Sequence, residues 1–372
     1  MHTVRYNNRN REFFNTLKKR VDEHFKSKNI SRNGDYRMVI KTIAMYGIYL
    51  TPFALMLTGA VTNGWLMLGL CVVMGIGMAG IGLAIMHDAN HGSYSKNQKL
   101  NNWIGYSLNV IGGYSFNWKL QHNNIHHTFT NVEGVDEDIA PPGFLRFSPH
   151  APLWKIHRFQ HIYAWFFYGF MTLMWVTTKD FKQLSRYNKS GLMKQYKTSF
   201  TREFIKIFLC KISYYAVMLV MPFILLDLPW YSILGGFLIM QFVAGLILAA
   251  IFQPAHVVEE TSFPTPDENG MLETDWAVHQ MYTTANFAPD NKILSWYCGG
   301  LNYQVEHHLF PTICHVHYRD ISPIVEKTAK EFGIPYYSQK TFRSALVSHV
   351  KMLKKFGTEK PEFIIVPARN AN

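Results

Sequence analysis

The sequence predicts an all-α integral membrane protein, with four transmembrane helices in two hairpins, interfacial helices and a cytoplasmic cap that carries a histidine metal site. Three observations lead to this fold class. Two long stretches are almost free of charged residues, the Arg and Lys residues gather outside those stretches, and histidines occur in three short clusters. The mean hydropathy of −0.05 averages over this uneven distribution.

Between Lys41 and His87 the chain has no charged residue, which leaves room for two spans of about 20 residues each. We expect these spans at residues 42–62 and 65–86. A second charge-poor region is broken by Asp227 and Pro229 and predicts spans at 207–226 and 230–255.

The net charge of +12 comes largely from basic residues before Lys41 and from residues 179–211. The positive-inside rule places both segments in the cytoplasm. No basic patch is interleaved with aromatic residues as in a nucleic-acid-binding domain, so attraction to anionic lipid head groups is the simpler explanation. The expected domains are a basic head (1–41), a first hairpin (42–86), a cytoplasmic and interfacial region (87–206), a second hairpin (207–255) and a cytoplasmic cap (256–372).

The three histidine clusters are HDANH (87–91), HNNIHH (122–127) and QVEHHLF (304–310). Histidines four residues apart share one face of a helix, so the first two clusters could each direct two imidazoles at one point. The absence of an HExxH string disfavours a zinc hydrolase, but imidazole alone does not select among iron, copper, nickel and zinc. A metal transporter is the non-enzymatic alternative, although its ligands should lie near the middle of the membrane.

A shared metal requires all three clusters on one side of the membrane. Residues 97–121 are therefore expected to form an interfacial helix, and the uncharged segment 159–178 to lie in or along the membrane without crossing it. Residues 344–356 are expected to form a helix in the cap. The four cysteines form no CxxC pair and indicate neither a disulfide framework nor a thiolate site.

Four segments resemble the signature segments of the membrane fatty acid desaturases, and the resemblance extends from about residue 34 onward. They are HDANHGSYSKN (87–97), QHNNIHHTFTN (121–131), DWAVHQMYTTANF (275–287) and GGLNYQVEHHLFPTICHVHY (299–318). In the last segment Gln304 occupies a position where most desaturases have His. This glutamine is typical of the front-end, delta-6 type branch.

The resemblance implies a di-iron centre held mainly by histidines. The implied ligands are His87, His91, His122, His126, His127, His307 and His308, with His256 at the end of the fourth span as the expected eighth. His279 is the other candidate for that place. The side chains that could bind iron weakly or accept hydrogen bonds from the ligands are Gln304, Asp88, Glu306, Asp136 and Asp138.

The implied activity is front-end fatty acid desaturation, in which O2 is the co-substrate, two iron ions are the cofactor and a cis double bond is formed. A sphingolipid desaturase or a fatty acyl hydroxylase is the alternative within the same superfamily. The acyl group could be carried on a membrane lipid or on coenzyme A. The chain has no HPGG motif of a fused cytochrome domain, so the expected electron donor is a separate ferredoxin or free cytochrome, as in bacterial members of the family. The expected location is a bacterial inner membrane, or the endoplasmic reticulum if the source is eukaryotic.

Overall fold

The computed structural model describes residues 4–7 and 11–362 and is mostly helical. It divides into two compact units. Unit 1 comprises Met1–Arg32, Gln121–Ala164 and Ile251–Asn372, and unit 2 comprises Asn33–Leu120 and Trp165–Ala250.

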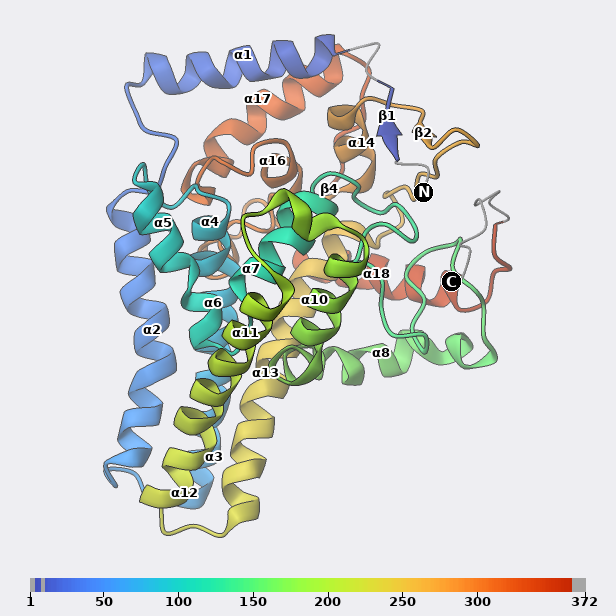
Figure 1. Cartoon of the computed structure of the whole chain (residues 1–372). Helices are drawn as coiled ribbons and strands as arrows, with labels where there is room; N and C mark the ends of the chain where they lie inside the picture. The colour runs from blue at the N-terminus through green and yellow to red at the C-terminus, as the bar shows by residue number, and fades with distance from the viewer. Residues whose placement is uncertain (1–3, 8–10, 363–372) are drawn as a thin grey trace. The chain divides into compact units, whose positions relative to one another are not determined.

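Four helices in the described part of the chain are long and apolar enough to cross a membrane, as the sequence predicted (Figure 1). They are α2 (Tyr36–Leu57), the continuous helix Gly64–Asn90 formed by α3, η1 and α4, the continuous helix Phe200–Leu225 formed by α11, η6 and α12, and α13 (Trp230–His256). The bounds predicted for the second and fourth spans differ from these by at most four residues.

The first and third of these helices begin six and seven residues before the predicted spans. The Asp35 side chain accepts a hydrogen bond from the Arg37 backbone amide and caps α2, and Ser199 caps α11 in the same way through Arg202. A helix can continue past the lipid with charged residues in its first turns. The absence of charged residues therefore located the apolar part of each helix but did not reveal the capping residue at which the helix begins.

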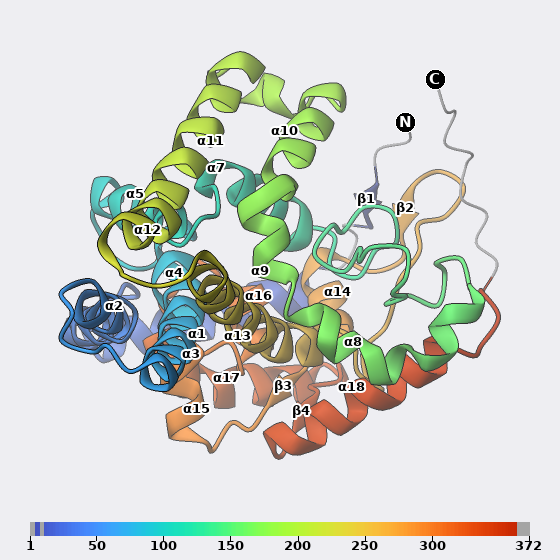
Figure 2. The same ribbon diagram turned by 90° about the horizontal axis from the view of Figure 1, so that it is seen from below.

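In unit 2, α2 and α3 run side by side, and Figure 2 views both nearly end-on. A Cβ atom at Gly77 would lie 2.6 Å from the Tyr49 backbone nitrogen, so the two helices approach as closely as their backbones allow. The other elements of this unit are α3 (Gly64–Gly80), η1 (Ile81–Met86), α4 (His87–Asn90), α5 (Gln98–Gly105), α6 (Ser107–Val110), α7 (Ser115–Trp118), α9 (Met171–Met174), η4 (Trp175–Lys179), α10 (Asp180–Lys189), η5 (Leu192–Gln195), α11 (Phe200–Tyr215), η6 (Ala216–Val220) and α12 (Met221–Leu225).

The prediction of one interfacial helix over 97–121 is wrong. The segment forms three short helices, α5, α6 and α7, followed by the start of the π-helix η2 (Lys119–His126). Gly112, with a φ of 88°, separates α6 from α7 because this left-handed conformation cannot continue a helix. Residues 159–178 are also divided, at Gly169, into α8 (Gln160–Tyr168) and the pair α9 and η4, which continues into the charged helix α10. Neither part is among the four candidate spans.

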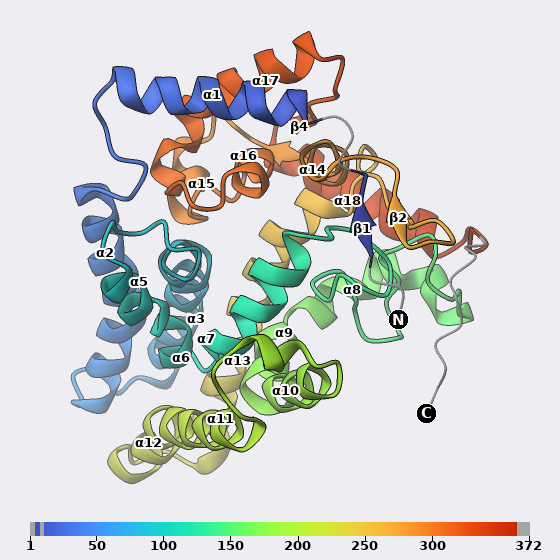
Figure 3. The same cartoon turned by 45° about the horizontal axis from the view of Figure 1, so that its top comes forward.

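In unit 1, the amphipathic helix α1 (Glu12–Ser27) lies along α17 (Tyr318–Glu331), as Figure 3 shows. Its apolar face, with Phe13, Leu17, Val21 and Phe25 at helical spacing, enters a core shared with α14, α16 and α17. The remaining elements are β1 (Arg5–Tyr6), η3 (Lys155–Phe159), β2 (Met271–Leu272), α14 (Trp276–Thr283), β3 (Asn286–Phe287), α15 (Lys292–Tyr297), α16 (Gln304–Leu309), η7 (His315–His317), β4 (Ser338–Gln339) and α18 (Phe342–Phe356). The strands form two parallel pairs, β1 with β2 and β3 with β4.

The composition of unit 1 differs from the predicted cap. Besides the C-terminal residues it includes the N-terminal helix and the segment that carries the second histidine cluster. The predicted domain division followed the chain between spans and therefore could not show that α1 packs on α17. The helix expected at 344–356 corresponds to α18, which begins two residues earlier at a cap formed by Thr341.

Candidate metal centre

Six of the eight predicted ligands lie in unit 1, on three elements. The π-helix η2 and the turn after it carry His122, His126 and His127, while α13 ends at His256. Helix α16 carries His307 and His308. All six imidazoles are buried, with exposed fractions between 0% and 6%.

Two of these histidines hydrogen-bond to carboxylates that follow them in the chain. The Asp136 Oδ2 atom lies 2.9 Å from His126 Nδ1, and the Asp138 Oδ2 atom lies 2.8 Å from His122 Nδ1. Burial alone would lower the pKa of His126, but the charge and hydrogen bond of Asp136 outweigh it, so the pKa is raised. A more basic imidazole is a stronger metal ligand.

Three further Nδ1 atoms have neutral oxygen partners. The Thr283 carbonyl lies 3.2 Å from His256 Nδ1, the Gln280 Oε1 atom lies 2.8 Å from His308 Nδ1, and the Tyr318 hydroxyl lies 3.1 Å from His307 Nδ1. Carbonyl, amide and carboxylate oxygens only accept hydrogen bonds, so four of the five Nδ1 atoms must carry the proton. Only the Tyr318 hydroxyl leaves the tautomer of its histidine open.

A proton on Nδ1 leaves the lone pair of a neutral imidazole on Nε2, the atom that can bind a metal. The Nε2 atoms of His126 and His256 are buried and have no hydrogen-bond partner among the described residues. Within unit 1 the donor atoms of His126, His256 and His308 all lie within 4.8 Å of one another, and so do those of His127, His307 and His308. Buried nitrogen donors gathered in this way fit a metal ion of the kind imidazole binds.

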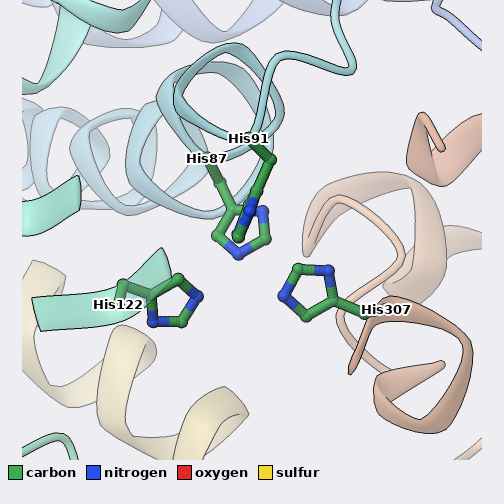
Figure 4. Close-up of side chains that lie close together, drawn as sticks. All are labelled: His87, His91, His122 and His307. Carbon is green, nitrogen blue, oxygen red and sulfur yellow. The ribbon is translucent and has the colours of Figure 1, made fainter. Parts of the chain in front are cut away.

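The rings of the second and third clusters are in contact. The ring centroids of His127 and His308 are 4.3 Å apart and nearly stacked, and those of His127 and His307 are 4.5 Å apart. His122 and His307, labelled in Figure 4, have ring centroids 6.1 Å apart and ring planes inclined by 16°. The second and third clusters therefore form one group, although about 180 residues separate them in the chain.

The remaining two predicted ligands, His87 and His91, lie in unit 2. They are presented by α4, directly after the π-helix η1, and their ring centroids are 4.7 Å apart. Figure 4 shows the two rings leaving one helix in the same direction. Both rings pack against Trp118, at 5.6 and 5.5 Å. The spacing of the first cluster thus brings its two imidazoles to one face, as predicted.

Comparison with known proteins identifies the family. The family model described as fatty acid desaturase matches residues 63–340, which is most of the chain. The chain belongs to the fatty acid desaturase family. A relative from Arthrospira platensis, named sn-1 linoleoyl-lipid 6-desaturase, is 35% identical over 347 residues, covering 92% of each chain. A relative of the same name from Synechocystis is 34% identical and covers 93% of this chain and 96% of its own.

An acyl-lipid (8-3)-desaturase from Physcomitrium patens is 38% identical, with 94% of this chain and 72% of the relative covered. The membership and these relatives confirm that the protein is an oxidoreductase and a front-end desaturase, as the Gln304 position indicated.

In this desaturase His279 is held differently from His256. Its Nε2 atom lies 2.7 Å from the Thr130 carbonyl, and it is not part of either histidine group of unit 1. Burial lowers the pKa of His279 to about 4, against the opposing effect of the Thr130 hydrogen bond, so the ring is neutral and Nε2 carries the proton. Of the two candidates for the eighth ligand, the structure brings only His256 to the other histidines.

The other predicted side chains have distinct positions in the desaturase. Asp136 and Asp138 accept hydrogen bonds from ligand histidines, whereas Asp88 Oδ1 lies 3.7 Å from Nδ1 of the adjacent His87. Glu306 accepts hydrogen bonds from Asn286 Nδ2 and the Tyr336 hydroxyl and from no imidazole among the described residues. Gln304 is buried on α16, and its Oε1 atom has no described hydrogen-bond partner.

Burial raises the pKa of Glu306 to about 6, although the hydrogen bonds from Tyr336 and Asn286 oppose the shift. The Asn286 side chain also accepts from the Val305 amide at 2.9 Å. These hydrogen bonds fix the first turn of α16 and therefore the position of His307 and His308, which follow in the same helix. Glu306 thus stabilises helix α16. The expected hydrogen bond from Glu306 to a ligand imidazole is not among its contacts with the described residues.

The sequence did not identify Gln280 of α14. Its Oε1 atom lies 2.8 Å from both His308 Nδ1 and the Thr130 hydroxyl, and Thr130 Oγ1 lies 2.7 Å from the His126 carbonyl oxygen. One buried amide therefore connects the turn after the second cluster with the helix of the third cluster. The available signal was its place in DWAVHQMYTTANF, but a glutamine next to a histidine has no distinctive spacing.

Substitution of Gln280 tests whether it holds His308 in the metal-binding tautomer. We expect Gln280→Leu to lower the metal affinity of purified protein by about 10-fold or more, because His308 Nδ1 loses its acceptor. Gln280→Glu keeps an acceptor and should retain metal. The measurement is metal content by mass spectrometry together with the melting temperature.

Gln160→Leu is the matched control, because Gln160 is equally buried in unit 1 and bonds only backbone groups of Arg146 and Leu353. It should lower stability without a selective loss of metal. Equal metal content in Gln280→Leu and the unsubstituted protein would contradict the role of Gln280.

Proposed function

We propose that this desaturase binds two iron ions through His87, His91, His122, His126, His127, His256, His307 and His308. The proposal rests on the hydrogen bonds that four buried imidazoles make through Nδ1. These bonds hold the proton on Nδ1 and leave Nε2 to bind a metal. The placement of His87 and His91 on one face of α4 supports their membership of the same set. With O2, bound iron supplies the strong oxidant that an unactivated methylene group requires.

The side chains of this protein would prepare the site for that chemistry. Asp136 and Asp138 retain the Nδ1 protons of His126 and His122, which keeps these imidazoles in one orientation. Phe252 packs on both His126 and His256, with ring centroids 5.3 and 4.9 Å away, and excludes water from that side. Exclusion of water protects a reactive oxidant from side reactions. Gln304 could bind iron weakly or hydrogen-bond a ligand, since its buried Oε1 atom is available.

We propose that the four spans form two hairpins whose histidine-bearing ends face the cytoplasm. The basic residues of 1–41 and 179–211 support this orientation through the positive-inside rule. The segment 159–178 would then lie in or along the membrane. An acyl chain would reach the histidines from the lipid phase.

The proposed reaction is insertion of a cis double bond between the carboxyl group and an existing double bond, at carbon 6 of a linoleoyl group on a membrane lipid. Support comes from the similarity over nearly the whole chain to two sn-1 linoleoyl-lipid 6-desaturases. The similarity to an (8-3)-desaturase makes carbon 5 the competing position. A sphingolipid desaturase or an acyl hydroxylase with the same ligands is the further alternative.

Expression in a host fed with linoleate tests the reaction. Gas chromatography with mass spectrometry should reveal a triene with a new cis bond at carbon 6, mainly in the lipid fraction. His126→Ala, which removes a proposed ligand, should yield no triene. A hydroxylated acyl chain, or no new product from any fed fatty acid or sphingoid base, would contradict the proposed activity.

A pair of histidine substitutions tests the eighth ligand. His256→Ala should reduce the iron content of purified protein, because a buried donor next to His126 and His308 is lost. His279→Ala should keep iron near the original level, since His279 Nε2 already donates to the Thr130 carbonyl. Loss of iron only in His279→Ala would instead identify His279 as the eighth ligand and exclude His256.

We propose that a separate acidic electron carrier, either a ferredoxin or a free cytochrome, reduces the centre. The net charge of +12 would attract an acidic donor and speed its association. The turnover rate at limiting donor should therefore fall as salt rises from about 10 mM to 150 mM, because the Debye length shortens from roughly 30 to 8 Å. A rate that does not change with salt would exclude electrostatic steering.

A further inference from the structure

Unit 2 contains a cavity of about 490 Å³ that the desaturase reaction does not account for. It lies among α2, α3, α12 and α13, next to the two turns that join these helices. Its volume falls in the range of sites that bind small ligands. The cavity is lined by side chains from all four candidate spans.

The lining is chemically uniform. None of the residues that line the cavity is charged, and only Trp65, Cys71 and Ser232 bring a polar side-chain group. Five of the lining residues are methionines, whose flexible side chains adapt to an irregular apolar ligand. The part of a ligand that enters the cavity must therefore be apolar, because none of the lining residues could bind a charged group.

The position of the cavity indicates the source of the ligand. Trp65, Trp230 and Tyr231, which are 84%, 64% and 62% exposed, begin the two helices that border it. Exposed aromatic residues at span ends mark the level of the lipid head groups. The cavity thus begins just below one membrane surface.

This surface is the one opposite the first histidine cluster. Along the continuous helix Gly64–Asn90, the lining residue nearest to His87 is Met74, which lies 13 residues or about 20 Å before it. That distance is more than half of the roughly 30 Å hydrocarbon thickness of a bilayer. The cavity is therefore separate from the first histidine cluster and opens toward the other leaflet.

We propose that the cavity binds one acyl chain of a phospholipid from the leaflet opposite the first histidine cluster. The uncharged lining accepts the chain, while Trp65 and Ser232 lie at the height where the ester groups of that lipid would sit. A bound chain would fill the space between the helix pairs and hold them at a fixed separation. The proposal does not depend on the iron site or on the acyl substrate.

Two glycines in the lining allow the cavity to be filled. A Cβ atom at Gly235 would have no other atom within 4 Å, and the same holds for Gly64 on the facing helix. By contrast, a Cβ atom at Gly236 would lie 2.9 Å from Cys71 Sγ. Phenylalanine at position 235 or 64 can therefore enter the empty volume without displacing backbone. Glycine costs helix stability relative to other residues, so neither change should unfold its helix.

Native mass spectrometry of the full-length protein, released from nanodiscs of phosphatidylcholine and phosphatidylglycerol, tests the proposal. The unsubstituted protein should retain one phospholipid more than Gly235→Phe and Gly64→Phe. Gly69→Phe is the control, because Gly69 lies on α3 outside the lining and also has open space around it. It should retain the same number of lipids as the unsubstituted protein.

Three results would overturn the proposal. No retained phospholipid in the unsubstituted protein would show that the cavity does not hold a lipid. Equal retention in all four proteins would place any retained lipid elsewhere. Conversion of a dimer to a monomer by Gly235→Phe would show that a second copy of the chain fills the cavity.

Discussion

The structure of the histidine site depends on one constraint, which is that each imidazole must keep its proton on the nitrogen that faces away from its neighbours. Buried neutral imidazoles crowded together would otherwise have no preferred tautomer, and a proton on the inner nitrogen would exclude a metal. Carboxylates satisfy the constraint for His122 and His126, a backbone carbonyl for His256 and an amide for His308. These oxygen acceptors come from two separate segments of unit 1, which are the loop with Asp136 and Asp138 and the helix α14 with Gln280 and Thr283. The fold of unit 1 thus places hydrogen-bond acceptors next to the Nδ1 atoms of the histidines.

This requirement explains why distant parts of the chain are combined in one unit. Helix α14 supplies Gln280 and also Trp276, whose indole N–H donates to the His127 carbonyl at 2.8 Å. Helix α17 supplies Tyr318 and packs against α1 through the face of Phe13 and Leu17. An N-terminal helix that touches no ligand therefore contributes indirectly to the orientation of His307. Buried hydrogen bonds of this kind make the surrounding core rigid, and rigidity keeps the donor nitrogens together.

The elements that could be predicted from the sequence are those with a local pattern. Uncharged stretches indicated the four long helices, and histidine spacing indicated the ligands, because hydropathy and helical periodicity act within a few turns. The limits of α2 and α11 were missed because a cap such as Asp35 or Ser199 lies outside the apolar pattern. The break at Gly112 was missed because a single glycine does not reveal its φ angle. Gln280 could not be found at all, since its partner His308 lies 28 residues away and only tertiary packing joins them.

Two of the π-helical segments in the described part of the chain, η1 before His87 and η2 around His122 and His126, limit how this protein can change in length. The amide of His127 bonds the carbonyl of His122 at 3.0 Å, five residues back, so one turn holds an additional residue. Loss of a single residue from η2 would restore ordinary α-helical winding and remove the five-residue offset between His122 and His127. The side chains of the wide turn, His126 among them, would then change position relative to Asp136. Natural variation at this place should therefore take the form of residue exchange, while insertions and deletions collect in the turns between helices.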